Sequence, residues 1–225
     1  MFEWSPLWLT LKLALFTTLI LFCAAVPLAN WLSKEKSVFK TITEVFVSMP
    51  LILPPSVIGF YMLLAFSPGN AFGAFLEKWF DIRLAFSFGG LLIASVIYSL
   101  PFMVHPIQSG LASLPPSLKE ASYSLHKTER QTLFRVLLPN IKPSILTGII
   151  LTFAHTIGEF GVVLMIGGNI PGKTRTVSVT IYDEVEAFNY HTANAYALIL
   201  LAVSFVTLFL LYIYNRRVAQ INVIR

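Results

Sequence analysis

Five long apolar stretches dominate the 225-residue sequence and constrain its fold more than any other feature. They cover residues 7–31, 42–66, 86–104, 145–167 and 193–214. Each is long enough for a bilayer-spanning helix, which needs roughly 20 mainly apolar residues. Hydrophobic residues make up 56% of the chain and charged residues only 12%, too apolar a balance for a soluble domain. We therefore expect an all-α membrane protein with about five transmembrane helices in a single domain, residues 1–225.

Basic residues concentrate in alternate connections between these stretches. The connections after the first, third and fifth stretches hold Lys34, Lys36, Lys40, Lys119, Lys127, Arg130, Arg135, Lys142, Arg216, Arg217 and Arg225. The other two connections carry two basic residues each. Because Lys and Arg accumulate in cytoplasmic loops, we expect the N-terminus outside and the C-terminus in the cytoplasm. No soluble basic face is predicted, which argues against nucleic acid as a partner.

Five helices are few for enclosing a polar pathway, which must be shielded from lipid on all sides. A homodimer would supply about ten helices, and we expect one. The four histidines, His105, His126, His155 and His191, have no metal-ligand spacing, and no nucleophile motif is present. The sequence therefore predicts neither a metal site nor a catalytic residue.

The longest polar segment, residues 109–143, lies between the third and fourth stretches. Pro115 and Pro116 suggest a helix start, and leucines then recur at roughly helical spacing. We expect Pro139 to end a second short helix. Two short amphipathic helices must pack on something, either a partner protein or their own bundle.

This segment resembles the cytoplasmic EAA loop of permeases in binding-protein-dependent ABC importers. The resemblance rests on Glu-Ala-Ser-Tyr-Ser-Leu-His at residues 120–126 and Phe-Arg-Val-Leu-Leu-Pro at residues 134–139. It implies a type I ABC importer permease fold and a loop that docks on a separate ATPase subunit. The implied contact residues are Glu120, Ala121, Ser122, Leu125, His126, Lys127 and Arg130. The family usually has glycine at position 126; histidine adopts positive φ less readily, but we expect the turn to be kept.

Prolines interrupt the second apolar stretch, where Pro50, Pro54 and Pro55 remove backbone donors. Such breaks are tolerated where the freed carbonyls face protein or a water-filled cavity, although a simple packing kink is the alternative. The segment, with Ser56, resembles the proline-rich stretch of molybdate permeases that lines or adjoins the translocation route.

The fourth stretch holds two ionisable residues, His155 and Glu159, one helical turn apart. Ionisable groups at hydrocarbon depth are costly and usually functional, although a satisfied interhelical hydrogen bond is the plainer alternative. The surrounding Gly-Glu-Phe-Gly, residues 158–161, resembles the signature of molybdate and sulfate permeases near the gate, and implies a role for Phe160 as well. A carboxylate would repel an anion, so we expect Glu159 to pair with His155 or to hold the gate together across helices.

Residues 167–174 fit the nucleotide-binding pattern G-x-x-x-x-G-K-T. A phosphate loop must lie between a strand and a helix, but this one follows a spanning helix, so we reject that interpretation. The stretch instead resembles the external loop of molybdate permeases. Asn169, Lys173 and Arg175 belong to it, and the two cations are candidates to receive an anion or its carrier protein; ordinary solvated charges are the alternative.

The resemblance to the molybdate and sulfate branch covers nearly the whole chain. It implies a homodimeric permease in the lipid of a prokaryote's cytoplasmic membrane, importing molybdate with two ABC ATPase subunits and an external molybdate-binding protein. ATP and magnesium would bind the ATPase, leaving this chain without cofactor or enzymatic activity. The same importer carrying sulfate, thiosulfate or tungstate is an alternative. An ATP-independent channel, a secondary transporter and an intramembrane hydrolase built on Glu159 and His155 are more distant ones.

Overall fold

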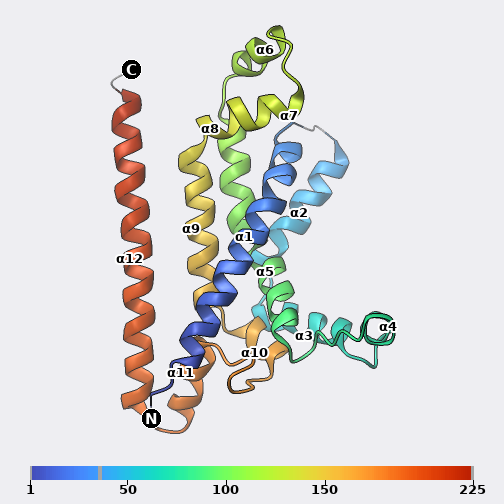
Figure 1. Ribbon diagram of the computed structural model, residues 1–225, viewed down its shortest axis with the longest axis vertical. Helices are drawn as coiled ribbons and strands as arrows, with labels where there is room; N and C mark the ends of the chain where they lie inside the picture. Colours follow the sequence, from blue (N-terminus) through green and yellow to red (C-terminus); the bar gives the residue numbers. More distant parts are fainter. Residues whose placement is uncertain (1, 35–36, 224–225) are drawn as a thin grey trace.

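The structure is a computed structural model that describes residues 2–34 and 37–223, with backbone alone for 216–223. Lys36, Arg225 and the side chains of Arg216 and Arg217 lie outside the described part. Within it the chain is all-helical, as expected (Figure 1). The helices are α1 (Ser5–Lys34), α2 (Val38–Ile52), α3 (Pro55–Phe66), α4 (Ala71–Phe80), α5 (Phe88–Ala112), α6 (Pro116–Ser124), α7 (Glu129–Thr132), the π-helical turn η1 (Leu133–Leu137), α8 (Leu138–Asn140), α9 (Lys142–Gly158), α10 (Gly161–Gly167), α11 (Val177–Glu186) and α12 (Tyr190–Val223).

Three of these helices, α1, α5 and α12, are long and apolar enough to cross a bilayer singly. Two bent pairs raise the number to as many as five if each pair is one span: α2 with α3, bent by 112°, and the segment Glu129–Asn140 with α9, bent by 80°. The first bend follows from Pro54 and Pro55, since Leu53 before them is extended and ends α2. About five spans were expected, and the three to five candidates include this number at their upper limit.

Two boundaries differ from the sequence-based expectation. The fourth apolar stretch is not one helix, because α9 ends at Gly158 and α10 begins at Gly161. Pro139 is not the last residue of its helix either: α8 runs from Leu138 to Asn140 and ends one residue after the proline. The preceding π-helical turn passes directly into that position, so the chain stays helical until Asn140.

The helices place the connections at two opposite ends of the bundle (Figure 1). One end carries α6, α7, α8, the C-terminus and the end of α1. The other end carries the N-terminus, α4, α10 and α11. The connections rich in Lys and Arg therefore share one end. We call it the inner end and its opposite the outer end, following the predicted orientation.

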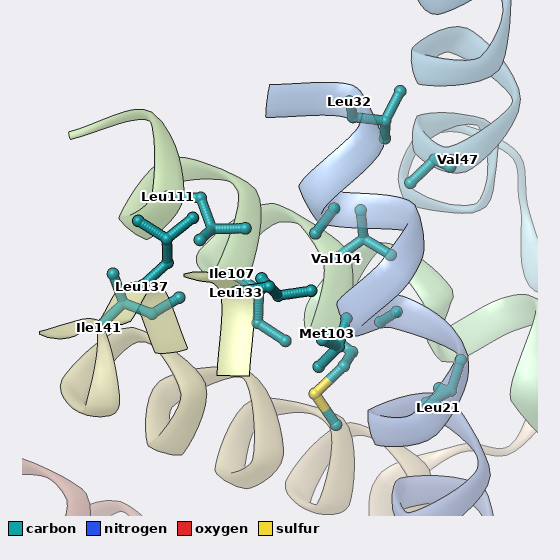
Figure 2. Packing of buried hydrophobic residues seen from close by; sticks show 13 residues of the cluster. Leu21, Leu32, Val47, Met103, Val104, Ile107, Leu111, Leu133, Leu137 and Ile141 are labelled. Atoms are coloured by element: carbon teal, nitrogen blue, oxygen red, sulfur yellow. The ribbon is translucent and has the colours of Figure 1, made fainter. Parts of the chain in front are cut away.

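The inner half of the core lies between α1, α5 and the polar segment that precedes α9 (Figure 2). Leu32 of α1 and Ile107 of α5 are fully buried there, and Leu133, Leu137 and Ile141 from the polar segment pack into the same cluster. This segment is thus anchored in the bundle by η1 and is not a loose loop.

By contrast, α12 lies at one side of the bundle (Figure 1) and exposes apolar side chains along its length, including Leu201, Phe205 and Phe209. A helix with exposed apolar side chains in a membrane protein faces lipid.

Candidate functional site

Polar side chains form a seam between α5 and the outer half of α9. Ser95 donates a hydrogen bond to Glu159 Oε2 at 2.9 Å. One helical turn along α5, Ser99 Oγ lies 3.0 Å from His155 Nδ1 and 3.1 Å from the Thr156 hydroxyl. His155 and Glu159 therefore each pair with a serine of α5, and no hydrogen bond or ion pair joins them to each other within the described residues. Of the two arrangements expected for Glu159, the contact across helices is the one observed.

The helix break between α9 and α10 centres on Glu159 and Phe160. Glu159 follows the last helical residue in an extended conformation, and its carbonyl accepts a hydrogen bond from Ser178 Oγ of α11 at 2.5 Å. Glu159 is 4% exposed, and its Oε1 atom has no hydrogen-bond partner in the structure. This one residue thus connects α5, the break and α11.

The two glycines that flank this break have different surroundings. A Cβ at Gly161 would lie 2.7 Å from Pro55 Cβ, so glycine lets α10 approach the start of α3. A Cβ at Gly158 would meet nothing within 4 Å.

We expect Gly161→Ala to destabilise the protein by about 1–3 kcal/mol, because the proline ring cannot move aside easily. Gly158→Ala is the matched control and should be neutral or slightly stabilising, since alanine favours helix over glycine. Thermal unfolding of the two purified variants in detergent tests the difference. Equal unfolding midpoints would contradict the close packing of α10 on α3.

A cavity of about 560 Å³ lies beside the break. Its lining consists of Pro55, Ser56, Tyr98, Ala154, His155, Gly158, Glu159, Phe160 and Gly161. Five of the six residues predicted for the pathway are among them. Pro54 is not: it precedes α3 and shapes the break in the backbone.

A second cavity of about 540 Å³ lies nearer the inner end. Its lining consists of Leu51, Pro101, Phe102, His105, Pro106, Ser109, Pro143, Ser144, Thr147 and Leu151. The imidazole of His155, from the outer cavity, stacks on the ring of Phe102, from the inner cavity, with centroids 4.0 Å apart. The Tyr98 ring lies 5.0 Å from the same imidazole. These three rings lie where the two linings meet, because Tyr98 and His155 line the outer cavity and Phe102 lines the inner one.

Sequence reasoning missed the contribution of α5 to this site. Tyr98, Phe102, His105 and Ser109 recur at intervals of four, three and four residues, which places them on one helix face. That run of aromatic and polar residues within an apolar stretch was the available signal. None of the residues that line the two cavities is Lys or Arg.

At the inner end, α6 closes with a sharp turn at His126. The φ angle of His126 is 53°, in the left-handed region where glycine is usual, and the turn expected there is present. The amide of Lys127 bonds to the carbonyl of Ser122, and that of His126 to the carbonyl of Tyr123. This pattern is a Schellman motif, which satisfies the last carbonyls of a helix.

Six of the seven residues predicted for the ATPase contact are exposed, and they lie along α6, its turn and α7. They are Glu120, Ala121, Leu125, His126, Lys127 and Arg130. Ser122 differs: it is buried, and its hydroxyl lies 2.8 Å from that of Thr132. Ser122 therefore joins α6 to α7. Lys34 and Glu129 form an ion pair that fastens α7 to the end of α1.

The outer connection between α10 and α11 is held by its own polar groups. Asn169 donates to both carboxylate oxygens of Asp183, at 2.9 and 2.7 Å, and accepts from Arg175 Nε at 2.8 Å. Arg175 thus takes part in internal bonding, whereas Lys173 lines a cavity of about 610 Å³ together with Arg83. The stretch that resembles a phosphate loop follows α10, with helix on both sides and no strand among the described residues nearby.

Apolar helices that enclose polar groups and cavities at membrane depth are typical of a membrane transport protein. The chain matches the family described as binding-protein-dependent transport system inner membrane component over residues 14–220. It belongs to this family and is a multi-pass inner-membrane permease component.

Curated relatives carry different substrates in their names. The chain is 45% identical over 204 residues to the molybdenum transport system permease protein ModB of Azotobacter vinelandii, covering 91% of this chain and 90% of that protein. It is 35% identical over 170 residues to the sulfate transport system permease protein CysT of Escherichia coli K12, covering 76% of this chain and 61% of that protein.

Solved structures share the fold at low identity. A bacterial ABC transporter that imports alginate matches with a TM-score of 0.77 and 18% identity, over 95% of this chain and 78% of that chain. The inward-facing MetNI methionine ABC transporter matches with a TM-score of 0.71 and 17% identity, over 95% and 94%. The fold is therefore that of ABC importer permeases, as expected.

Proposed function

We propose that this chain is the membrane-spanning subunit of an ATP-driven molybdate importer. Two copies would form the pathway, two ABC ATPase subunits would bind the exposed surface of α6 and α7, and an external molybdate-binding protein would deliver the anion at the outer end. The N-terminus would lie outside and the C-terminus in the cytoplasm. The 45% identity to a molybdenum permease over nearly all of both chains supports this substrate.

The observation that carries the transport proposal is the pair of cavities along α5 and α9. Their polar lining consists of hydroxyls and imidazoles, from Ser56, Tyr98, His105, Ser109 and His155 among others, and of Glu159, whose Oε2 atom is bonded to Ser95. Neutral donors can bind a tetrahedral oxyanion, but more weakly than Lys or Arg would. A translocation pathway needs such weak sites, because a tightly held ion does not leave.

The ring stack of His155 and Phe102 would be the closed gate between these cavities. The segment that would bind the ATPase continues through η1 and α8 directly into α9, which carries His155. A shift of α6 and α7 on ATP binding would therefore move α9 against α5 and open the stack. ATP and magnesium would bind the separate ATPase subunits, and this chain would need no cofactor and would not itself be an enzyme.

Sulfate is the second candidate substrate, supported by the 35% identity to a sulfate permease. Uptake of labelled molybdate into proteoliposomes that hold the complete transporter and its binding protein separates the two. Tungstate should compete and excess sulfate should not. Competition by sulfate would favour the second candidate, and uptake without ATP would contradict the importer proposal.

A further inference from the structure

One short helix, α4, stands apart from the bundle at its outer end. It continues from α3, and both run across the direction of the long helices (Figure 1). Its ten residues span about 15 Å, too short to cross a bilayer. Leu76 packs on the outer core cluster, and Gly73 lies so close to Ser67 that a Cβ would clash with the Ser67 carbonyl. The side of α4 that carries Gly73 and Leu76 thus packs on the end of α3 and the outer core cluster.

The rest of its surface is divided into an aromatic face and a polar face. Phe72, Phe75 and Trp79 recur at intervals of three and four residues, and Phe80 adjoins them. They are 50%, 50%, 70% and 60% exposed, respectively. Within the described part of the chain, each of these four side chains keeps half or more of its surface uncovered. A soluble protein rarely exposes so large a patch without a partner.

The charges around α4 help to identify what covers the aromatic face. The segment carries Glu77, Lys78, Asp81 and Arg83, so its formal charges cancel. Arg83 Nε also donates to Glu77 Oε1 at 2.6 Å. A protein partner recognised by charge would need an excess of one sign, which this surface lacks. A zwitterionic membrane surface needs none.

The position of α4 agrees with a lipid partner. It adjoins α3, whose Phe60, Tyr61 and Leu64 are also exposed. Trp4 and Trp8 are exposed as well. They lie within the first eight residues, and the N-terminus is at the same end of the molecule as α4 (Figure 1). Trp and other aromatic residues gather at the boundary between hydrocarbon and headgroups, and amphipathic helices lie flat there.

We propose that α4 is an interfacial helix whose aromatic face inserts into the outer leaflet of the membrane. It anchors the C-terminal end of α3, which precedes α4, at the level of the headgroups. Since α3 begins at Pro55 on the outer cavity, the anchor also fixes one wall of that cavity relative to the bilayer. The proposal rests on the membrane location of the chain and is independent of its substrate.

Fluorescence of a single tryptophan tests this contact. Trp4→Phe, Trp8→Phe and Trp31→Phe together leave Trp79 as the reporter in the full chain, reconstituted in phosphatidylcholine vesicles. A second chain carries Ala74→Trp and Trp79→Phe in addition, which moves the reporter to the other side of the same helix. Lipids with a nitroxide near the headgroup should quench Trp79 at least about twofold more than the tryptophan at 74, because only the aromatic face reaches the acyl boundary.

Acrylamide in the water should give the opposite order. Quenching of Trp79 by acrylamide and not by the lipid nitroxide would show an aqueous face and overturn the proposal. Protection from both quenchers would show cover by protein, such as a second copy of the chain, and would overturn it equally. Phe75→Trp with Trp79→Phe in the same background provides a second reporter on the aromatic face and should repeat the Trp79 result.

Discussion

Glu159→Gln is expected to lower ATP-dependent uptake about tenfold, since a buried unsatisfied donor costs roughly 1–3 kcal/mol and 1.4 kcal/mol is a factor of ten. The amide oxygen can still accept from Ser95. The amide nitrogen, however, then takes the place of Oε1, which is buried without a hydrogen-bond partner. The unsatisfied donor lies in the residue that connects α5, the helix break and α11. We therefore expect a larger effect on the uptake rate than on the stability of the whole fold.

Uptake per folded transporter, with thermal unfolding measured in parallel, separates an effect on transport from an effect on stability. Ser95→Ala removes the donor of the same hydrogen bond and should change uptake in the same direction. Glu186→Gln makes the same chemical change on an exposed residue of α11 and should leave uptake unchanged. Full uptake and full stimulation of ATP hydrolysis by the binding protein in Glu159→Gln would contradict the gate role.

Leu125→Asp is expected to abolish coupled transport by weakening ATPase binding. Leu125 is 70% exposed at the end of α6. An apolar side chain is stabilised when its surface is removed from water, so a partner that covers Leu125 would gain binding free energy. If it fills the ATPase contact, an aspartate there would have to be desolvated without a partner. Loss of a central contact costs about 2 kcal/mol or more, which is roughly 30-fold in affinity. Copurification of the ATPase with the tagged permease measures this loss.

Ser117→Asp is the matched control, because it introduces the same charge in the first turn of the same helix. An acid at that end favours the helix and lies away from the tip. It should leave ATPase binding intact. Normal copurification of Leu125→Asp would contradict the docking role and leave the alternative that α6 and α7 only cover their own bundle.

The sequence predicted about five spans, at the upper limit of the three to five candidates in the structure, and one of the two helix breaks. Apolar length alone identifies the candidate spans, since an unbroken helix needs roughly 20 residues to cross the hydrocarbon core. Proline gives the break before Pro55, because it has no backbone donor and restricts the residue before it. The left-handed turn at His126 was also predictable, from the resemblance of its surroundings to a loop that has glycine there. The orientation of the chain stays a prediction.

The second helix break was not predictable in the same way. No proline lies between Gly158 and Gly161, and local preference alone would have allowed one continuous helix. The break depends on contacts from distant segments: Ser178 donates to the Glu159 carbonyl, and Gly161 packs on Pro55. Pairing of His155 with Glu159, one of the two arrangements expected, assumed a continuous helix; each residue instead has its own serine on α5, which is a contact across helices.

The sequence by itself thus determined which segments are long and apolar enough to cross a membrane, where proline interrupts one of them and which connections carry the basic residues. These features follow from chain length, apolarity and backbone chemistry. Only the tertiary structure decided which polar side chains meet. Ser95 and Ser99 lie more than fifty residues from their partners, and Arg175 is bonded to Asn169 while Lys173 faces a cavity. Partners of that kind depend on how helices pack, because a polar group buried in the bundle must take whichever donor or acceptor the neighbouring helix presents.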